Sequence, residues 1–77
     1  MEKITKPKFI ELILAATKLT INGIPRSDVR IHSTYIATKM PDGDFAYLRF
    51  KGNKYFYDND NKIIVETNCY PVYITLN

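Results

Sequence analysis

The first part of the chain carries apolar residues at helical spacing. Leu, Ile, Ala, Glu and Lys dominate residues 6–19, and apolar residues that recur every three to four positions predict an amphipathic helix. Thr5 is suited to cap the N-terminus of this helix, and Pro7 falls in the first turn, where a missing N–H costs nothing. The Asn22-Gly23 pair supplies a stop signal. We therefore predict a single helix over about residues 6–19.

After residue 28 the pattern changes to strands. β-Branched and aromatic residues alternate between clusters of Gly, Pro, Asp and Asn. The alternation predicts strands at residues 29–39, 45–51, 54–57, 62–67 and 72–76. A helix followed by meandering antiparallel strands belongs to the α+β class. We predict one domain over residues 1–77, with the N-terminal helix packed on a four- to five-stranded antiparallel sheet, and a sheet rolled into a partial barrel as a variant.

The Gly52-Asn53 pair is typical of a two-residue hairpin loop. Pairing across this loop sorts the side chains of residues 45–57 between two faces of the sheet. One face carries Tyr47, Arg49 and Phe56, with Lys51 and Lys54 at one end. The next hairpin is expected to pair Tyr57 with Lys62, which places Ile64 on the opposite face, with Tyr55 and Tyr57.

Both predicted sheet faces are apolar, whereas an antiparallel sheet usually has one polar face in water. The helix has a similar excess, because Ile10 and Leu14 lie outside its main apolar stripe, which contains Phe9 and Leu12. A strongly curved sheet could hide this excess within one molecule. We favour the other explanation, in which an apolar surface meets a partner.

Composition and charge exclude few classes of protein. The chain has 77 residues, 45% of them hydrophobic and 13% aromatic, which favours a folded globule over disorder. A net charge of +3 permits nucleic-acid binding without indicating it. The lone Cys69 predicts no internal disulfide and a reducing cytoplasm. No segment is apolar enough for a signal peptide or a membrane span, so we expect no membrane partner.

No residue pattern predicts catalysis. Residues 58–62 begin like a calcium loop, but Ile63 stands where such a loop needs glycine. His32 and Cys69 are each unique, too few for a zinc site and more typical of structural residues than of a nucleophilic pair. The three glycines lie in separate turns and form no phosphate-binding loop. We expect no enzyme, no metal, no cofactor and no small-molecule substrate.

We therefore interpret the chain as a protein-interaction module, an accessory subunit or inhibitor that binds a larger protein or a second copy of itself. The expected contacts are Tyr47, Arg49, Phe56, Ile10 and Leu14. The alternative is single-stranded nucleic acid, with bases stacked on aromatic side chains and phosphates held by cations. Its expected contacts are Tyr47, Arg49, Lys51, Lys54 and Phe56. Small size and abundant Lys, Asn and Ile fit a phage or other mobile element of an AT-rich bacterium.

Overall fold

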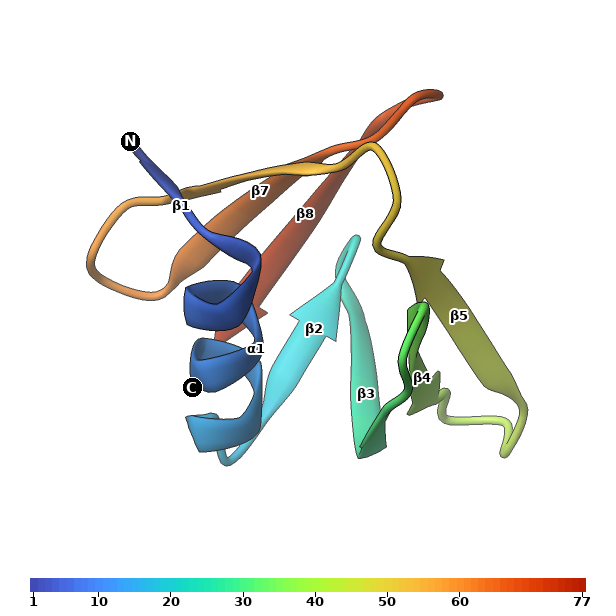
Figure 1. The fold of residues 1–77 in the computed structure, drawn as a ribbon. Coiled ribbons are helices and arrows are strands. Elements are labelled where there is room, and N and C mark those ends of the chain that lie inside the picture. The colour runs from blue at the N-terminus through green and yellow to red at the C-terminus, as the bar shows by residue number, and fades with distance from the viewer.

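The computed structural model describes residues 1–77 and contains one helix and eight strands (Figure 1). The elements are, in chain order, β1 (Glu2–Ile4), α1 (Lys6–Ala15), β2 (Leu19–Ile21), β3 (Ile24–Ile31), β4 (Tyr35–Lys39), β5 (Phe45–Arg49), β6 (Lys54–Tyr57), β7 (Lys62–Glu66) and β8 (Pro71–Leu76). All strands form one antiparallel sheet in the order β1-β6-β7-β8-β2-β3-β4-β5. The prediction of an α+β fold with a four- to five-stranded sheet is therefore wrong, since eight strands and one short helix make up the fold.

The Asn22-Gly23 pair, predicted to stop the helix, instead forms the turn of the β2–β3 hairpin. Both residues are left-handed, with φ of 51° and 79°, and Ile21 pairs with Ile24 across them. Positive φ at both central residues is the type I′ arrangement, whose twist matches that of paired strands. The helix consequently ends at Ala15 rather than at residue 19, and the strands begin well before residue 29.

The segment predicted as one long strand over residues 29–39 is two strands. The chain reverses between β3 and β4, where the His32 N–H donates to the Tyr35 carbonyl over 2.9 Å, and Ile31 pairs with Ile36. The turn predicted around Gly43 is confirmed. Its amide donates to the Met40 carbonyl over 2.9 Å, which closes the β4–β5 hairpin.

Strands β5 and β6 do not form the predicted hairpin. The Asn53 N–H donates to the Phe50 carbonyl over 3.2 Å, and Gly52, with φ of 80°, occupies the third position of this turn. Glycine with positive φ at that position is typical of a type II turn, which splays the flanking strands apart. The chain therefore leaves β5 at one edge of the sheet and enters β6 next to β1, near the other edge.

The β6–β7 hairpin has a register one residue away from the prediction. Tyr57 pairs with Ile63 rather than with Lys62, and a slip of one residue exchanges the faces of a strand. Ile63 and Val65 are buried as a result, whereas Ile64 is only half-buried. The cause is a loop that begins at Asp58.

One carboxylate oxygen of Asp58 organises this loop. It accepts the backbone N–H groups of Asp60, Asn61 and Lys62 over 2.9, 3.1 and 3.0 Å. These hydrogen bonds, with that from Lys62 the largest contribution, lower the pKa of Asp58 below its ordinary value of 3.8. The residues that resemble the start of a calcium loop are thus held by their own backbone.

We expect Asp58→Asn to lower the melting temperature at neutral pH by more than it does in acid. A carboxylate with a lowered folded pKa stabilises the protein above its unfolded pKa, and this contribution is lost as the pH falls through the folded pKa. The difference between wild type and variant should therefore shrink between about pH 5 and pH 2. Circular dichroism melts at several pH values measure it. A difference independent of pH would contradict this role for Asp58.

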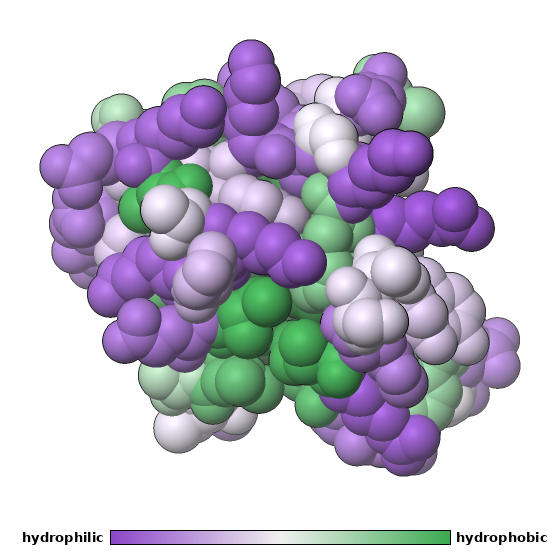
Figure 2. Space-filling model, in the orientation of Figure 1, coloured by the Kyte–Doolittle hydropathy of each residue, from purple (hydrophilic) through white to green (hydrophobic).

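The core joins the helix to the inner side of the bent sheet. Thr5 caps the helix as predicted, accepting the Lys8 N–H over 3.3 Å, and Pro7 lies in the first turn. Phe9 is fully buried, with its ring stacked on that of Tyr55 at 4.3 Å. Figure 2 shows apolar surface gathered in the recess between α1 and the β3–β4 part of the sheet.

Candidate interaction site

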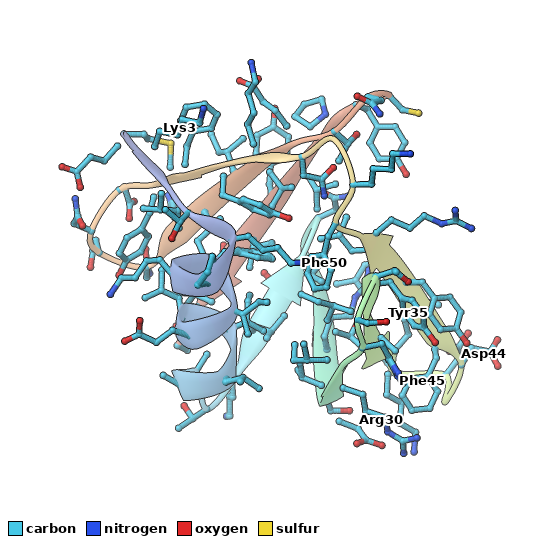
Figure 3. All side chains as sticks on the ribbon, viewed as in Figure 1. Lys3, Arg30, Tyr35, Asp44, Phe45 and Phe50 are labelled. Atoms are coloured by element: carbon cyan, nitrogen blue, oxygen red, sulfur yellow. The ribbon has the colours of Figure 1, made fainter.

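Aromatic and cationic side chains gather on the outer side of β3, β4 and β5 (Figure 3). This surface, here called the aromatic face, consists of Arg30, His32, Tyr35, Phe45, Tyr47 and Arg49. The β4–β5 register pairs Tyr35 with Arg49 and Ala37 with Tyr47. Odd-numbered residues of both strands consequently share this side of the sheet, while even-numbered residues turn inward.

The rings of the aromatic face support one another. Tyr35 lies between His32, stacked at 4.5 Å, and Tyr47, which meets it edge-on at 5.5 Å. The Arg30 guanidinium lies 4.8 Å from the centre of the Phe45 ring. Tyr47 nevertheless remains 67% exposed. A large aromatic side chain that is held in place and still exposed is a good anchor for a partner.

Arg30 and Asp28 balance part of the charge of this face. Two hydrogen bonds, of 2.9 and 3.3 Å, join the guanidinium to the carboxylate. They lower the pKa of Asp28 and raise the pKa of Arg30. Arg49 is exposed and makes no ion pair. The aromatic face therefore retains a free positive charge beside Tyr47.

Strand β5 is an edge of the sheet, and its outer backbone groups lack strand partners. The Phe50 N–H donates to the Thr34 carbonyl, and the Met40 N–H to that of Asp44. In an antiparallel pair, bonded residues alternate, so the even-numbered residues of β5 are those bonded to β4. The N–H groups of Phe45, Tyr47 and Arg49 point away from the sheet. Among their carbonyls, that of Arg49 accepts the Asn53 side-chain amide.

Strand β1, the other edge of the sheet, is better protected. It has only three residues, and two of them, Glu2 and Lys3, are charged and exposed. Short strands and charged side chains are the usual means by which proteins block unwanted pairing at a sheet edge. From Phe45 to Leu48, β5 carries no charge. The more open of the two edges is therefore the one that borders the aromatic face.

The residues predicted to bind a partner fall in three separate places: Tyr47 and Arg49 share one side of β5, and Ile10 and Leu14 lie one turn apart on α1. Phe56 is half-buried on β6, which is separated from β5 in the sheet order. Ile10 and Leu14 lie on α1, where Ile10 is half-buried and Leu14 is 59% exposed.

The predicted nucleic-acid contacts do not share a hairpin. Lys51 is exposed in the turn after β5, and Lys54 begins β6 opposite Glu66. Because β5 and β6 are not paired, the sheet face expected to carry these lysines with Tyr47, Arg49 and Phe56 is absent. Nucleic-acid binding therefore stays a prediction, but the shared sheet face from which it was inferred does not form.

Sequence reasoning missed Arg30, His32, Tyr35 and Phe45 as members of the site. Arg30, His32 and Tyr35 fall in the segment predicted as one strand, so the sequence predicts no contact between Tyr35 and Tyr47. The polar run His32-Ser33-Thr34 was the available signal, because clusters of small polar residues between apolar segments indicate turns.

Other reactive side chains are dispersed. Cys69 is exposed in the β7–β8 loop, while His32 belongs to the β3–β4 turn. No three side chains of the metal-ligating types gather at one place. The ten-residue helix α1 is too short to cross a lipid bilayer.

Comparisons with protein-family models, with curated proteins and with solved structures found no match. Assignment of a function therefore depends on this chain's own geometry. That geometry offers an exposed, preorganised aromatic surface beside an open strand edge, an arrangement suited to recognition.

Proposed function

We propose that the protein is a non-enzymatic interaction module that binds an extended segment of a partner protein along β5. The observation that carries this proposal is the combination of free outward N–H groups on β5 with the exposed Tyr47 ring above them. An extended peptide that joins a sheet edge gains affinity from backbone hydrogen bonds and specificity from alternate side chains. An accessory subunit or an inhibitor would work in this way.

The partner segment is defined by the chemistry of the aromatic face. A residue of the segment that points to this face meets Tyr47 and, through it, Tyr35. A neighbouring residue on the same side meets Arg49, which has no ion pair of its own. An apolar or aromatic residue two positions away from an acidic residue would satisfy both contacts, with the acidic residue first if the segment runs antiparallel to β5.

We expect Tyr47→Lys to weaken binding of such segments by about tenfold or more, as loss of a central aromatic anchor does. The measurement uses a displayed library of random peptides. Peptides enriched on the wild-type protein are titrated against both proteins, while amide exchange at Phe45, Tyr47 and Arg49 is followed by NMR. Bound peptide should slow exchange at these three amides.

The matched control is Tyr73→Lys. Tyr73 is 55% exposed on β8, a strand paired on both sides with β7 and β2. This substitution should leave peptide binding unchanged. Equal losses from both variants, peptides bound away from β5, or no enrichment at all would contradict the proposal.

A second copy of the chain is the other occupant that this edge would accept. Two β5 strands paired antiparallel around Tyr47 would place Phe45 opposite Arg49. Sedimentation velocity over a range of concentrations distinguishes this case. A dimer that forms with wild type and Tyr73→Lys, but not with Tyr47→Lys, would assign β5 to self-association.

A further inference from the structure

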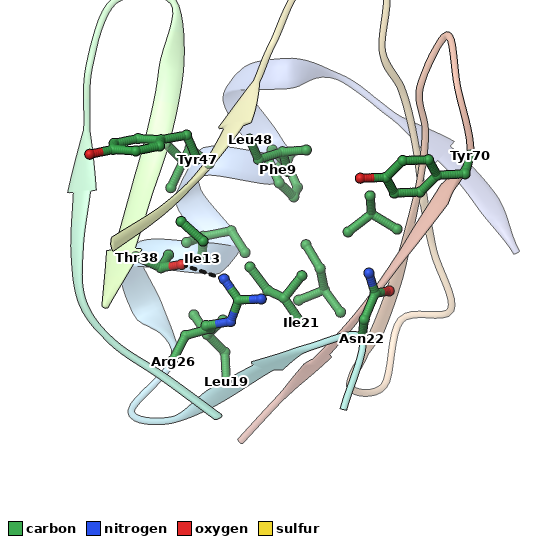
Figure 4. A pocket seen from close by; sticks show the side chains of 14 residues that line it. Phe9, Ile13, Leu19, Ile21, Asn22, Arg26, Thr38, Tyr47, Leu48 and Tyr70 are labelled. Carbon is green, nitrogen blue, oxygen red and sulfur yellow. Dashed lines mark hydrogen bonds between the residues drawn. The ribbon is translucent and has the colours of Figure 1, made fainter. Parts of the chain in front are cut away.

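A cavity of about 170 Å³ lies on the inner side of the sheet, and Ala46, Tyr47 and Leu48 of β5 form part of its wall (Figure 4). Eleven of the fourteen lining residues are hydrophobic. Helix α1 and strands β2 and β8 contribute Phe9, Ile13, Leu19, Ile21, Val72 and Ile74, and β4 and β5 contribute Ile36, Ala46, Tyr47 and Leu48. A cavity of roughly 150 Å³ with such a lining holds a molecule the size of benzene.

A single charged group projects into this cavity. Figure 4 shows the Arg26 guanidinium among the apolar side chains, with Tyr47 and Tyr70 on opposite sides of the opening. The Arg26 Nη1 donates to the Thr38 hydroxyl over 3.1 Å. Its Nε is buried without any hydrogen-bond partner. No carboxylate lines the cavity, and Arg26 makes no ion pair.

A bulge in β3 places this cation on the inner side. Arg26 pairs with the buried Leu19, which directs both side chains inward. Between Ser27 and Arg30 the register shifts, and Asp28 has φ of 49°. An extra residue of this kind exchanges the faces of a strand, so Val29 also packs on the core. Burial lowers the pKa of Arg26, as expected for a cation with no counter-charge.

We infer that the cavity binds a small apolar monocarboxylate, aromatic or short-chain aliphatic. The apolar body fills the space beside Ile21 and Ile74, and the carboxylate accepts hydrogen bonds from Arg26. A planar guanidinium matches a carboxylate geometrically, and one cation balances one negative charge. This site departs from the expectation that the protein has no small-molecule partner, and it does not depend on peptide binding at β5.

The test compares benzoate with benzyl alcohol, a neutral molecule with the same ring. Titration of isotope-labelled protein followed by NMR should shift the Arg26 and Thr38 amides. Benzoate should bind about tenfold more tightly than benzyl alcohol. Arg26→Met should remove this preference and leave benzyl alcohol binding unchanged. Arg30→Met is the matched control, because Arg30 is paired with Asp28 on the aromatic face, and it should keep the preference.

Ala46→Leu provides a second measurement that does not depend on removing the cation. Ala46 lines the cavity, so a larger side chain should exclude both molecules. If Arg26→Met fails to fold, the affinities of benzoate and benzyl alcohol for the wild type and for Ala46→Leu still test the inference. Equal binding of benzoate and benzyl alcohol would overturn the inference. So would shifts confined to the aromatic face, or no binding of benzoate below about 10 mM.

Discussion

Replacement of Phe9 by alanine is expected to lower the free energy of unfolding by about 3–5 kcal/mol, the usual cost of truncating a fully buried phenylalanine. Phe9 has no exposed surface, stacks on Tyr55 and lines the cavity wall. A chain of this length is expected to have a total stability of only about 4–12 kcal/mol. The variant should therefore unfold at much lower urea concentration, as followed by circular dichroism.

Leu14→Ala is the matched control for this prediction. Leu14 lies on the same helix but is 59% exposed, so its truncation should change the free energy of unfolding by no more than about 0.5 kcal/mol. Similar losses from the two variants would mean that the helix packs through a different face from the one described. The comparison also tests whether Leu14 is a surface residue, as the prediction that it contacts a partner requires.

Gly52→Ala is expected to cost about 1–2 kcal/mol, because an L-residue at φ of 80° is strained by roughly that amount. An added Cβ would also lie 2.7 Å from the side-chain nitrogen of Asn68. Asn68 is exposed, so its side chain can turn away at little cost. Thermal unfolding measures the loss. Gly52 is sensitive because its turn carries the chain from β5 towards the opposite edge of the sheet.

Two further variants separate the backbone strain from the contact with Asn68. Gly43 has φ of 94° and open space around it, so Gly43→Ala should show the backbone cost alone. Gly52→Ala should show about the same loss as Gly43→Ala, because the exposed Asn68 side chain can turn away. A much larger loss from Gly52→Ala, relieved by adding Asn68→Ala, would contradict this expectation and show that Asn68 is held in place.

Local chemistry explains the elements that were predicted correctly. The helix begins at Lys6 because Thr5 and Pro7 act within a few residues of one another. The turn around Gly43 is likewise closed by its own neighbours. The Asn22-Gly23 pair shows the limit of such signals, because the same two residues are suited either to the end of a helix or to a type I′ hairpin. Only a strand partner, supplied here by β8, decides between them.

Some features of the candidate site follow from the local sequence, and others depend on the tertiary structure. Strand alternation by itself places Tyr47 and Arg49 on one side of β5, since alternation is a property of the local backbone. It does not reveal that β5 is an edge strand, that β6 pairs elsewhere, or that Tyr35 supports Tyr47. Strand pairing depends on contacts between residues remote in the chain, and a bulge or a one-residue slip exchanges the faces of a strand.

The sequence alone therefore determined that this protein has one helix near its N-terminus, that strands dominate the remainder, and that an aromatic and cationic segment lies around Tyr47. The tertiary structure decided that eight strands form one sheet, that the outward backbone of β5 is unpaired, and that Arg26 enters an apolar cavity. The physical reason is that side-chain period and turn chemistry are local, whereas an edge and a cavity exist only after distant segments have packed together.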